Sequence, residues 1–446
     1  MTRAAAAIGL PAQLPPATRA AGAATRPWGW SWERAGRWLF FAALLAAAPV
    51  ALNRAIQHLG GTDFPEYYAA GAHVLAHGLP LQQAMTAYYL PSVDIAWAGL
   101  ALLPLPAAAA VWYLGGCAAW IALVQAIRHY LLAACDETTR RQATLAAGLL
   151  VTPLVADQLC IGAFHGLMLW LMVAGLGRAS QGRCWSGGIL LGLGIWLKLL
   201  PALGVVYLLL KRKWLAAATA VVVAAAFDLL LCLAVFGQQA TWELHDKWLH
   251  RDAAGTAEAL LTSPKLLNEQ RVTNQSLPVV LRRTLTQLGV PSHSSRDLAV
   301  VGNLSGPQLK MVYGLLVGVI ILALGWFFRR PWHRLSAEDW SHEIALLVLS
   351  TLWFSPIAPS YHPIAAAPAL AVLIAHHMHQ RLGWAVVGLW SLAMILHAVP
   401  TARAFGHVLW MTMALGLLLA WNHRRLKASQ LRTVATPTSI QKAGIA

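Results

Sequence analysis

The sequence predicts an all-α, polytopic integral membrane protein, on the basis of its composition, its long apolar segments and the placement of its basic residues. Hydrophobic residues make up 58% of the 446 residues and charged residues only 11%, whereas soluble proteins usually carry about 25% charged residues. Apolar runs of about 18 residues or more recur along almost the whole chain, and each is long enough to cross a hydrocarbon core.

The apolar runs predict about 12 membrane segments, some of them short or broken by Pro or Gly. They lie near residues 37–56, 107–127, 143–157, 163–178, 185–198, 200–210, 214–236, 309–328, 342–356, 363–378, 383–400 and 406–423. Broken helices are tolerated where they are buried in protein or line a polar cavity. The stretch 185–210 is alternatively a single tilted helix with Lys198 inside it.

Composition divides the chain into a membrane domain at 35–425 and two tails, 1–34 and 426–446, that are expected to be disordered and cytoplasmic. Prolines interrupt any signal-peptide core in the first tail, so the first membrane helix is expected to remain as an uncleaved anchor. Within the membrane domain we expect an outer loop at 57–106, whose apolar spacing from Phe64 to Leu79 predicts a surface helix, and a long outer loop at 237–307.

The formal net charge of +16 does not indicate a nucleic-acid partner, because the basic residues cluster in short segments between apolar runs. This pattern follows the positive-inside rule, so the partner is the lipid bilayer of the cell inner (plasma) membrane. Both termini are then cytoplasmic, and Asp63 faces the exterior or periplasm. The residues assigned to the inner side are Arg128, Arg140, Arg141, Arg178, Arg183, Lys211, Arg212, Lys213, Arg329, Arg330, Arg334 and Arg381.

Neither the cysteines nor the histidines predict a metal site. The five cysteines are dispersed and form no Cys-x-x-Cys pair, so they are interpreted as packing residues. His376 and His379 can share a helix face, but no carboxylate or further ligand lies near them in sequence.

The most prominent candidate for chemistry is Asp63, in Asp63-Phe64-Pro65-Glu66-Tyr67-Tyr68 directly after the first apolar segment. An acidic residue at membrane depth costs about 2.5–3.5 kcal/mol on insertion scales, which favours a functional role. We interpret Asp63 as a general base. The alternative is a helix N-cap, with Glu66 completing a capping box.

Three further groups can bind an anion. Lys198 lies in an apolar run just before Pro201 and either pairs with an anion or snorkels to the interface. Arg282 and Arg283 follow Asn274 in the long outer loop, where a guanidinium fork suits a phosphate, although a solvated basic face is an alternative. His362 lies in a proline-rich break at 355–363.

In this order, the landmarks resemble glycosyltransferase family 87 of the GT-C superfamily, the polyprenol-phosphate-mannose-dependent mannosyltransferase type. The family's Asp-Phe-x-x-Tyr motif is similar to 63–67, and its Tyr-Pro-Pro and Pro-Leu patterns are approximated at 89–91 and 104–106. The Lys-x-x-Pro element matches 198–201, and Asn-Gln-Ser-Leu matches 274–277, with an arginine downstream.

Two elements of the family pattern are only partly kept. The Gly-Gln-x-Asn element retains Gln158 and has Cys160 in place of its asparagine. The Ser-Pro-x-Ser-Trp-x-His-His element retains Ser355-Pro356 and its second histidine, His362, whereas Tyr361 replaces the first.

The resemblance implies a GT-C-like fold and inverting transfer of a sugar, mannose in this family, from a polyprenyl-phosphate donor to an acceptor hydroxyl of a glycolipid, polysaccharide or protein. It implies Asp63 as the catalytic base and no cofactor or metal. The substrate-binding residues that it implies are Tyr67, Gln158, Lys198, Asn274, Arg282, Arg283 and His362.

Two other hypotheses remain open from the sequence. One is a transporter or flippase of a lipid-linked saccharide, and the other is a non-catalytic membrane subunit with altered motifs. The surface helix and the long outer loop favour an enzyme that binds an acceptor, because a rocking transporter is expected to show internal repeats.

Overall fold

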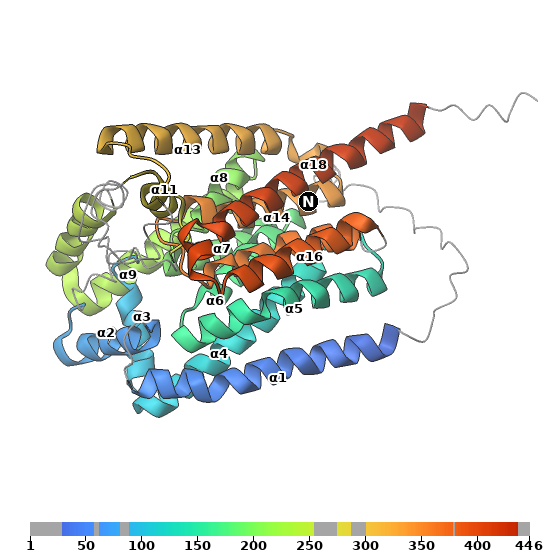
Figure 1. The fold of residues 1–446 in the computed structure, drawn as a ribbon. Coiled ribbons are helices and arrows are strands. Elements are labelled where there is room, and N and C mark those ends of the chain that lie inside the picture. Colours follow the sequence, from blue (N-terminus) through green and yellow to red (C-terminus); the bar gives the residue numbers. More distant parts are fainter. Residues whose placement is uncertain are drawn as a thin grey trace, which may run out of the picture.

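The structure is a computed structural model that describes residues 29–57, 62–80, 89–253, 274–286, 300–377 and 380–435. Among these residues the regular elements are all helices, as predicted (Figure 1). The main helices are α1 (Gly29–Ile56), α2 (Asp63–His77), α3 (Val93–Ala101), α4 (Leu105–Ala126), α5 (Glu137–Ile161), α6 (His165–Ser180), α7 (Cys184–Leu197), α8 (Ala202–Leu210), α9 (Trp214–Lys247), α11 (Leu277–Leu285), α13 (Gly306–Phe328), α14 (Ala337–Phe354), α15 (Ala367–His377), α16 (Arg381–Leu396), α17 (Pro400–Ala404) and α18 (His407–Ala435).

Five helices of the described chain, α1, α4, α5, α9 and α13, are long and apolar enough to cross a membrane. The helices α7 and α16 are shorter and also apolar. These helices support the prediction of a membrane protein, whereas the number of crossings stays a prediction. The single tilted helix at 185–210 is not found, because the chain breaks between α7 and α8 at residues 198–201.

The centre of the bundle is formed by α14 and α15, whose side chains are buried on nearly all sides. They pack against each other, and α5 and α18 also contact them. By contrast, α1 and α13 lie at the periphery and expose large apolar side chains, among them Leu45 and Leu315. A helix that is apolar all round is expected in a protein core or in contact with lipid, so this arrangement fits a membrane bundle.

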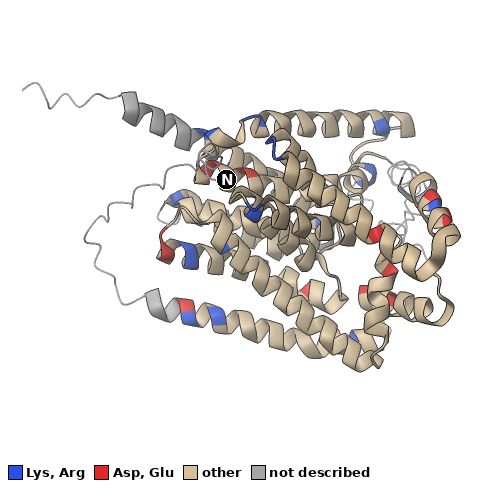
Figure 2. Cartoon of the chain, turned by 180° about the vertical axis from the view of Figure 1, so that it is seen from behind, with Lys and Arg blue, Asp and Glu red and all other residues tan. Residues whose placement is uncertain are grey.

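Charged residues concentrate at the two ends of the bundle and are few along its middle (Figure 2). At one end, α1 begins and α18 ends (Figure 1). The loop after α8 meets the loop after α13 at one point, where Lys211 donates to the carbonyls of Phe328 and Arg330 at 2.8 and 2.7 Å. Lys211 also forms a buried ion pair with Glu343 of α14 at 2.7 Å. Predicted inner loops thus meet in space, while the side of the membrane that they face stays a prediction.

The opposite end carries α2, α3, α11 and the second arm of α9 (Figure 1). The predicted surface helix is α2, and it begins at Asp63. Its N-cap is Thr62, which has an extended backbone, and no side chain caps the helix. The capping box of Asp63 and Glu66, the alternative to a general base, is not formed, because Asp63 occupies the first helical position and its carboxylate contacts two tyrosine hydroxyls.

The tails and loops are described in part. Helix α1 already begins at Gly29, inside the predicted tail 1–34, and α18 continues to Ala435, past residue 425. The first arm of the predicted loop 237–307 is helical, because α9 runs on to Lys247. Residues 1–28, 58–61, 81–88, 254–273, 287–299, 378–379 and 436–446 lie outside the described residues. They include two short pieces of the outer loop 57–106, much of the outer loop 237–307, Arg271 and His379.

The helices α2 and α3 cross at Gly71. A Cβ atom at this position would lie 2.3 Å from the backbone carbonyl of Trp97, which cannot move aside without shifting α3. We therefore expect Gly71→Ala to destabilise this end of the protein by about 1–3 kcal/mol, as overpacking does, and to lower its thermal unfolding temperature in detergent.

The matched control is Gly99→Ala in α3, where a Cβ atom meets nothing within 4 Å. This variant should unfold at the wild-type temperature or slightly above it, because Ala is the better helix former. Equal unfolding temperatures for the two variants would show that α2 and α3 do not pack in this way.

Candidate active site

Asp63 lies at the start of α2, where the helix dipole favours a negative charge. Its Oδ2 atom accepts hydrogen bonds from the hydroxyls of Tyr361 at 3.1 Å and Tyr67 at 3.3 Å. Burial raises the pKa of the Asp63 carboxyl above its ordinary value, and the nearby charge of Lys198 and the two hydroxyls oppose this rise. A partly exposed carboxylate with a raised pKa is suited to take up a proton.

Lys198 lies opposite, at the extended break between α7 and α8. Its Nζ atom is 3.3 Å from Nε2 of His362, which precedes α15. Burial lowers the pKa of Lys198 to about 8, and the Asp63 charge opposes the fall. Because burial also holds the pKa of His362 well below its usual value, the imidazole is neutral and accepts a hydrogen bond from the ammonium at Nε2.

A second histidine supports this pair. The ring of His165, at the start of α6, stacks on the ring of His362 with their centroids 4.2 Å apart and an interplanar angle of 11°. His362 is 1% exposed, and its Nδ1 atom has no hydrogen-bond partner among the described residues. With Nε2 accepting from Lys198, Nδ1 carries a hydrogen, so Lys198 and His362 together offer donors suited to an anion.

Aromatic side chains hold the first turns of α2, the helix that begins at Asp63, against α3. The ring of Tyr67 stacks on Trp97 of α3 with a centroid distance of 4.7 Å, and its hydroxyl lies 3.0 Å from that of Tyr89. Phe64 packs against Gly162, whose positive φ of 81° ends α5 and leaves no room for a Cβ atom. The position of Asp63 is thus set by neighbours on both sides of the helix.

Gln158 does not offer its amide to the site in this structure, because both of its polar atoms bind backbone. Its Nε2 atom donates to the carbonyl of Ala163 at 3.0 Å, and its Oε1 atom accepts from the N–H of Gly166 at 3.2 Å. These bonds hold the turn between α5 and α6 and thereby place His165. The adjacent Asp157 accepts a hydrogen bond from Ser360 at 2.5 Å, which ties α5 to the 355–363 break.

The side chains of Asn274 and Arg283 also form hydrogen bonds with backbone groups. The Oδ1 atom of Asn274 accepts from the N–H groups of Ser276 and Ala358, each at 3.0 Å, so the residues before α11 are fixed to the 355–363 break. Arg283 donates to the carbonyls of Ala404, Arg403 and Asn274 at 2.6, 2.9 and 3.3 Å, respectively.

Arg282 is 4% exposed, and burial lowers its pKa. Among the sequence candidates, Asp63, Tyr67, Lys198 and His362 gather at one place. Gln158, Asn274 and Arg283 instead bind backbone in neighbouring segments.

Sequence reasoning missed Tyr361, Tyr89 and His165 as members of the site. Tyr361 stands where the family pattern has a histidine, and its hydroxyl contacts the Asp63 carboxylate directly. Tyr89 stands in the segment that approximates the Tyr-Pro-Pro pattern, but it was not named as a site residue. Nothing in the sequence marked His165, whose role depends on the turn held by Gln158.

An all-α membrane bundle that gathers a carboxylate, an ammonium and an imidazole at one end has the features of a membrane-embedded enzyme. The sequence model of glycosyltransferase family 87 matches residues 88–356, which is more than half of the chain. The protein therefore belongs to glycosyltransferase family 87. The matched range includes Gln158, Lys198, Asn274, Arg282 and Arg283, whereas Asp63 and His362 lie outside it. No curated protein and no solved structure matches the chain.

The two hydrogen bonds of Asn274 to the backbone can be tested by mutation. Asn274→Ala leaves the N–H groups of Ser276 and Ala358 buried without their acceptor, and each such loss costs about 1–3 kcal/mol. We expect a lower thermal unfolding temperature and faster proteolysis at the 355–363 break. Asn303→Ala, at an exposed asparagine, is the control and should match the wild type. Identical behaviour of both variants would contradict the assigned contact.

Proposed function

We propose that this glycosyltransferase moves a sugar from a polyprenyl-phosphate donor to an acceptor hydroxyl, with Asp63 as the general base. The observation that carries the proposal is that Tyr361, beside His362, binds Asp63, while His362 contacts Lys198, whose charge acts on Asp63. A carboxylate and nearby proton donors match the two ends of a glycosyl transfer.

The transfer itself is a single displacement. The acceptor oxygen forms a bond to the anomeric carbon while the bond from that carbon to the phosphate oxygen breaks, and Asp63 takes the acceptor proton. The electron pair of the broken bond leaves with polyprenyl phosphate, whose growing negative charge is stabilised by the Lys198 ammonium and the His362 N–H. One displacement inverts the configuration at the anomeric carbon.

The finer features of this proposal rest on the family resemblance and on general chemistry. Mannose is the sugar of the family members that the chain resembles, and we place the site at the exterior face because the basic loops lie at the other end of the bundle. We expect the displacement to need no divalent cation, because a monophosphate leaving group carries little charge and Lys198 stands beside it.

The sharpest variant is Asp63→Asn, which keeps the size of the side chain and its contacts with the tyrosine hydroxyls but cannot accept the proton. We expect transfer to fall by about 10²–10⁴-fold, the usual contribution of a general base, with an unchanged unfolding temperature. Transfer is measured as label moved from a polyprenyl-phosphate sugar to acceptor by the purified protein.

Glu66→Gln is the matched control, because Glu66 is a partly exposed carboxylate one turn along the same helix. It should retain near wild-type transfer. Full activity of Asp63→Asn, or an equal loss in both variants, would rule out the assigned role of Asp63.

The shifted pKa values predict a bell-shaped pH dependence of transfer. The base must be ionised, so the rate falls as the pH drops through the pKa of Asp63, which lies above the ordinary carboxyl value. The cation must be protonated, so the rate also falls as the pH rises through about 8, the pKa of Lys198. In Lys198→Arg the basic limb should move to higher pH while the acid limb stays. A basic limb that is unchanged in this variant would assign it to another group.

A further inference from the structure

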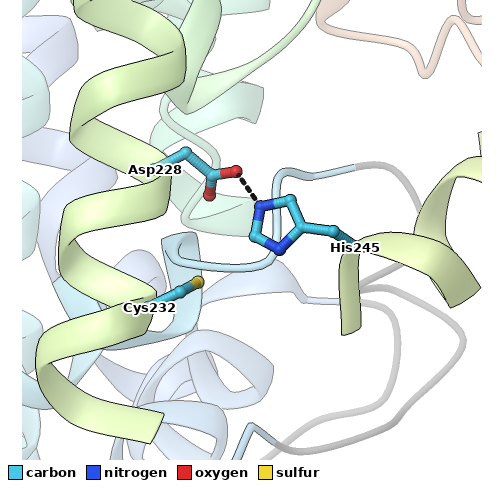
Figure 3. A group of neighbouring side chains, drawn as sticks. All are labelled: Asp228, Cys232 and His245. Atoms are coloured by element: carbon cyan, nitrogen blue, oxygen red, sulfur yellow. Dashed lines mark hydrogen bonds and ion pairs between the residues drawn. The ribbon is translucent and has the colours of Figure 1, made fainter. Parts of the chain in front are cut away.

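A second buried cluster, formed by Asp228, Cys232 and His245, lies apart from the candidate active site (Figure 3). Asp228 and Cys232 are four residues apart on the first arm of α9 and therefore share one face. In a straight helix His245 would lie about 25 Å from Asp228. The chain instead kinks at Gly237, whose φ of 77° and ψ of 173° are readily open only to glycine, and the second arm brings Nε2 of His245 to 2.8 Å from Oδ2 of Asp228.

The hydrogen bonds of His245 fix which of its nitrogen atoms faces Asp228. Its Nδ1 atom lies 2.7 Å from the carbonyl oxygen of Thr241, which can only accept, so Nδ1 carries a hydrogen. Nε2 therefore faces Oδ2 of Asp228, and a proton lies in the 2.8 Å contact between them. A metal ion can replace that proton once the two atoms move apart.

We propose that this cluster is a binding site for a divalent metal ion of the zinc class, with Oδ2 of Asp228, Sγ of Cys232 and Nε2 of His245 as ligands. One carboxylate, one thiolate and one imidazole form a ligand set that suits Zn²⁺, and three protein ligands leave the fourth tetrahedral position open. Figure 3 shows Asp228 and Cys232 on successive turns with His245 facing them.

A bound ion requires small movements of the ligands. The three ligand atoms lie within 4.8 Å of one another. An ion about 2.0–2.3 Å from each ligand holds the ligand atoms about 3.3–3.8 Å apart, so the sulfur has to move inward by at most about 1.5 Å. Nε2 of His245 and Oδ2 of Asp228, which are 2.8 Å apart here, have to separate by about 0.5 Å. Cys232 and Asp228 are both buried, at 0% and 3% exposure, so no lipid or bulk water has to be displaced from the sulfur.

The surroundings already orient the ligands as metal sites require. The carbonyl of Thr241 fixes the tautomer of His245, and the N–H of Ser92 donates to Oδ1 of Asp228 at 3.0 Å, so Oδ2 faces the ion. Outer contacts of this kind are typical of metal-binding histidines and carboxylates.

The charge balance of the occupied site also suits a divalent ion. With Zn²⁺ bound, the carboxylate of Asp228 and the thiolate of Cys232 carry two negative charges and the imidazole of His245 is neutral, so the ion and its ligands sum to zero. The buried site therefore holds no uncompensated charge when the ion is bound.

The proposed metal site contacts the segment 89–92, which in turn contacts the candidate active site. Ser92, which donates to Asp228, also accepts a hydrogen bond at 2.7 Å from Trp196, two residues before Lys198. Tyr89 lies three residues before Ser92, and its hydroxyl contacts that of Tyr67. The metal ion thus joins both arms of α9 to this segment, and it takes no part in the transfer step.

The test is a cobalt titration of the metal-stripped, detergent-purified full chain, because Co²⁺ bound to a thiolate gives a charge-transfer absorption band. We expect one Co²⁺ per chain, a cysteinate-to-cobalt band and displacement of that band by Zn²⁺. Cys232→Ser should abolish the band and weaken Zn²⁺ binding by more than about 10-fold, and His245→Gln should weaken binding likewise.

Matched controls are Cys184→Ser and His250→Gln, which remove a partly buried cysteine at the start of α7 and an exposed histidine of the α9 region. Both should bind as the wild type does. The wild-type titration decides the matter even if a variant fails to fold. A wild type that takes up no stoichiometric Co²⁺, or a charge-transfer band that persists in Cys232→Ser, would overturn the assignment. The readout needs neither donor nor acceptor, so it is independent of the proposed transferase activity.

Discussion

The electrostatic interaction of Asp63 with Lys198 is the constraint on which this end of the protein depends. Burial alone disfavours both charges, and it shifts their pKa values toward each other. The charge of each group opposes the shift that burial causes in the other. Two hydroxyls contact the carboxyl of Asp63, and an imidazole contacts the amine of Lys198. This arrangement suits one group to accept a proton and the other to bind an anion.

Helix breaks make this pairing possible. Lys198 lies in the break between α7 and α8, and His362 lies in the break between α14 and α15. Irregular backbone at membrane depth is stable only where protein surrounds it or where it lines a polar cavity, so the surrounding helices have to supply the missing contacts. Asn274 does so by accepting from the N–H of Ala358 in the break before α15. Gln158 and Arg283 bind backbone in two neighbouring irregular segments, the α5–α6 turn and the end of α17. Polar residues that the sequence presents as substrate ligands therefore serve in this structure as the support of the irregular segments.

Sequence reasoning predicted the helices well, because their length and apolar composition are local properties, and Pro201 marked the break after Lys198. It did not predict which partners meet, because these contacts depend on packing. Tyr361 is far from Asp63 in sequence, and the role of Gln158 became visible only with the turn that it holds. The Asp228–His245 contact was missed for a specific reason, since the sequence placed the end of the apolar segment at 236 and gave no sign that α9 folds back at Gly237.

The most direct measurement of the central claim is an experimental structure of the protein with a polyprenyl-phosphate sugar bound. The account predicts the phosphate oxygens within hydrogen-bonding distance of Lys198 and His362, and the anomeric carbon between these groups and the Asp63 carboxylate. A donor phosphate bound at the opposite end of the bundle, near Lys211, or a sugar turned away from Asp63, would contradict it.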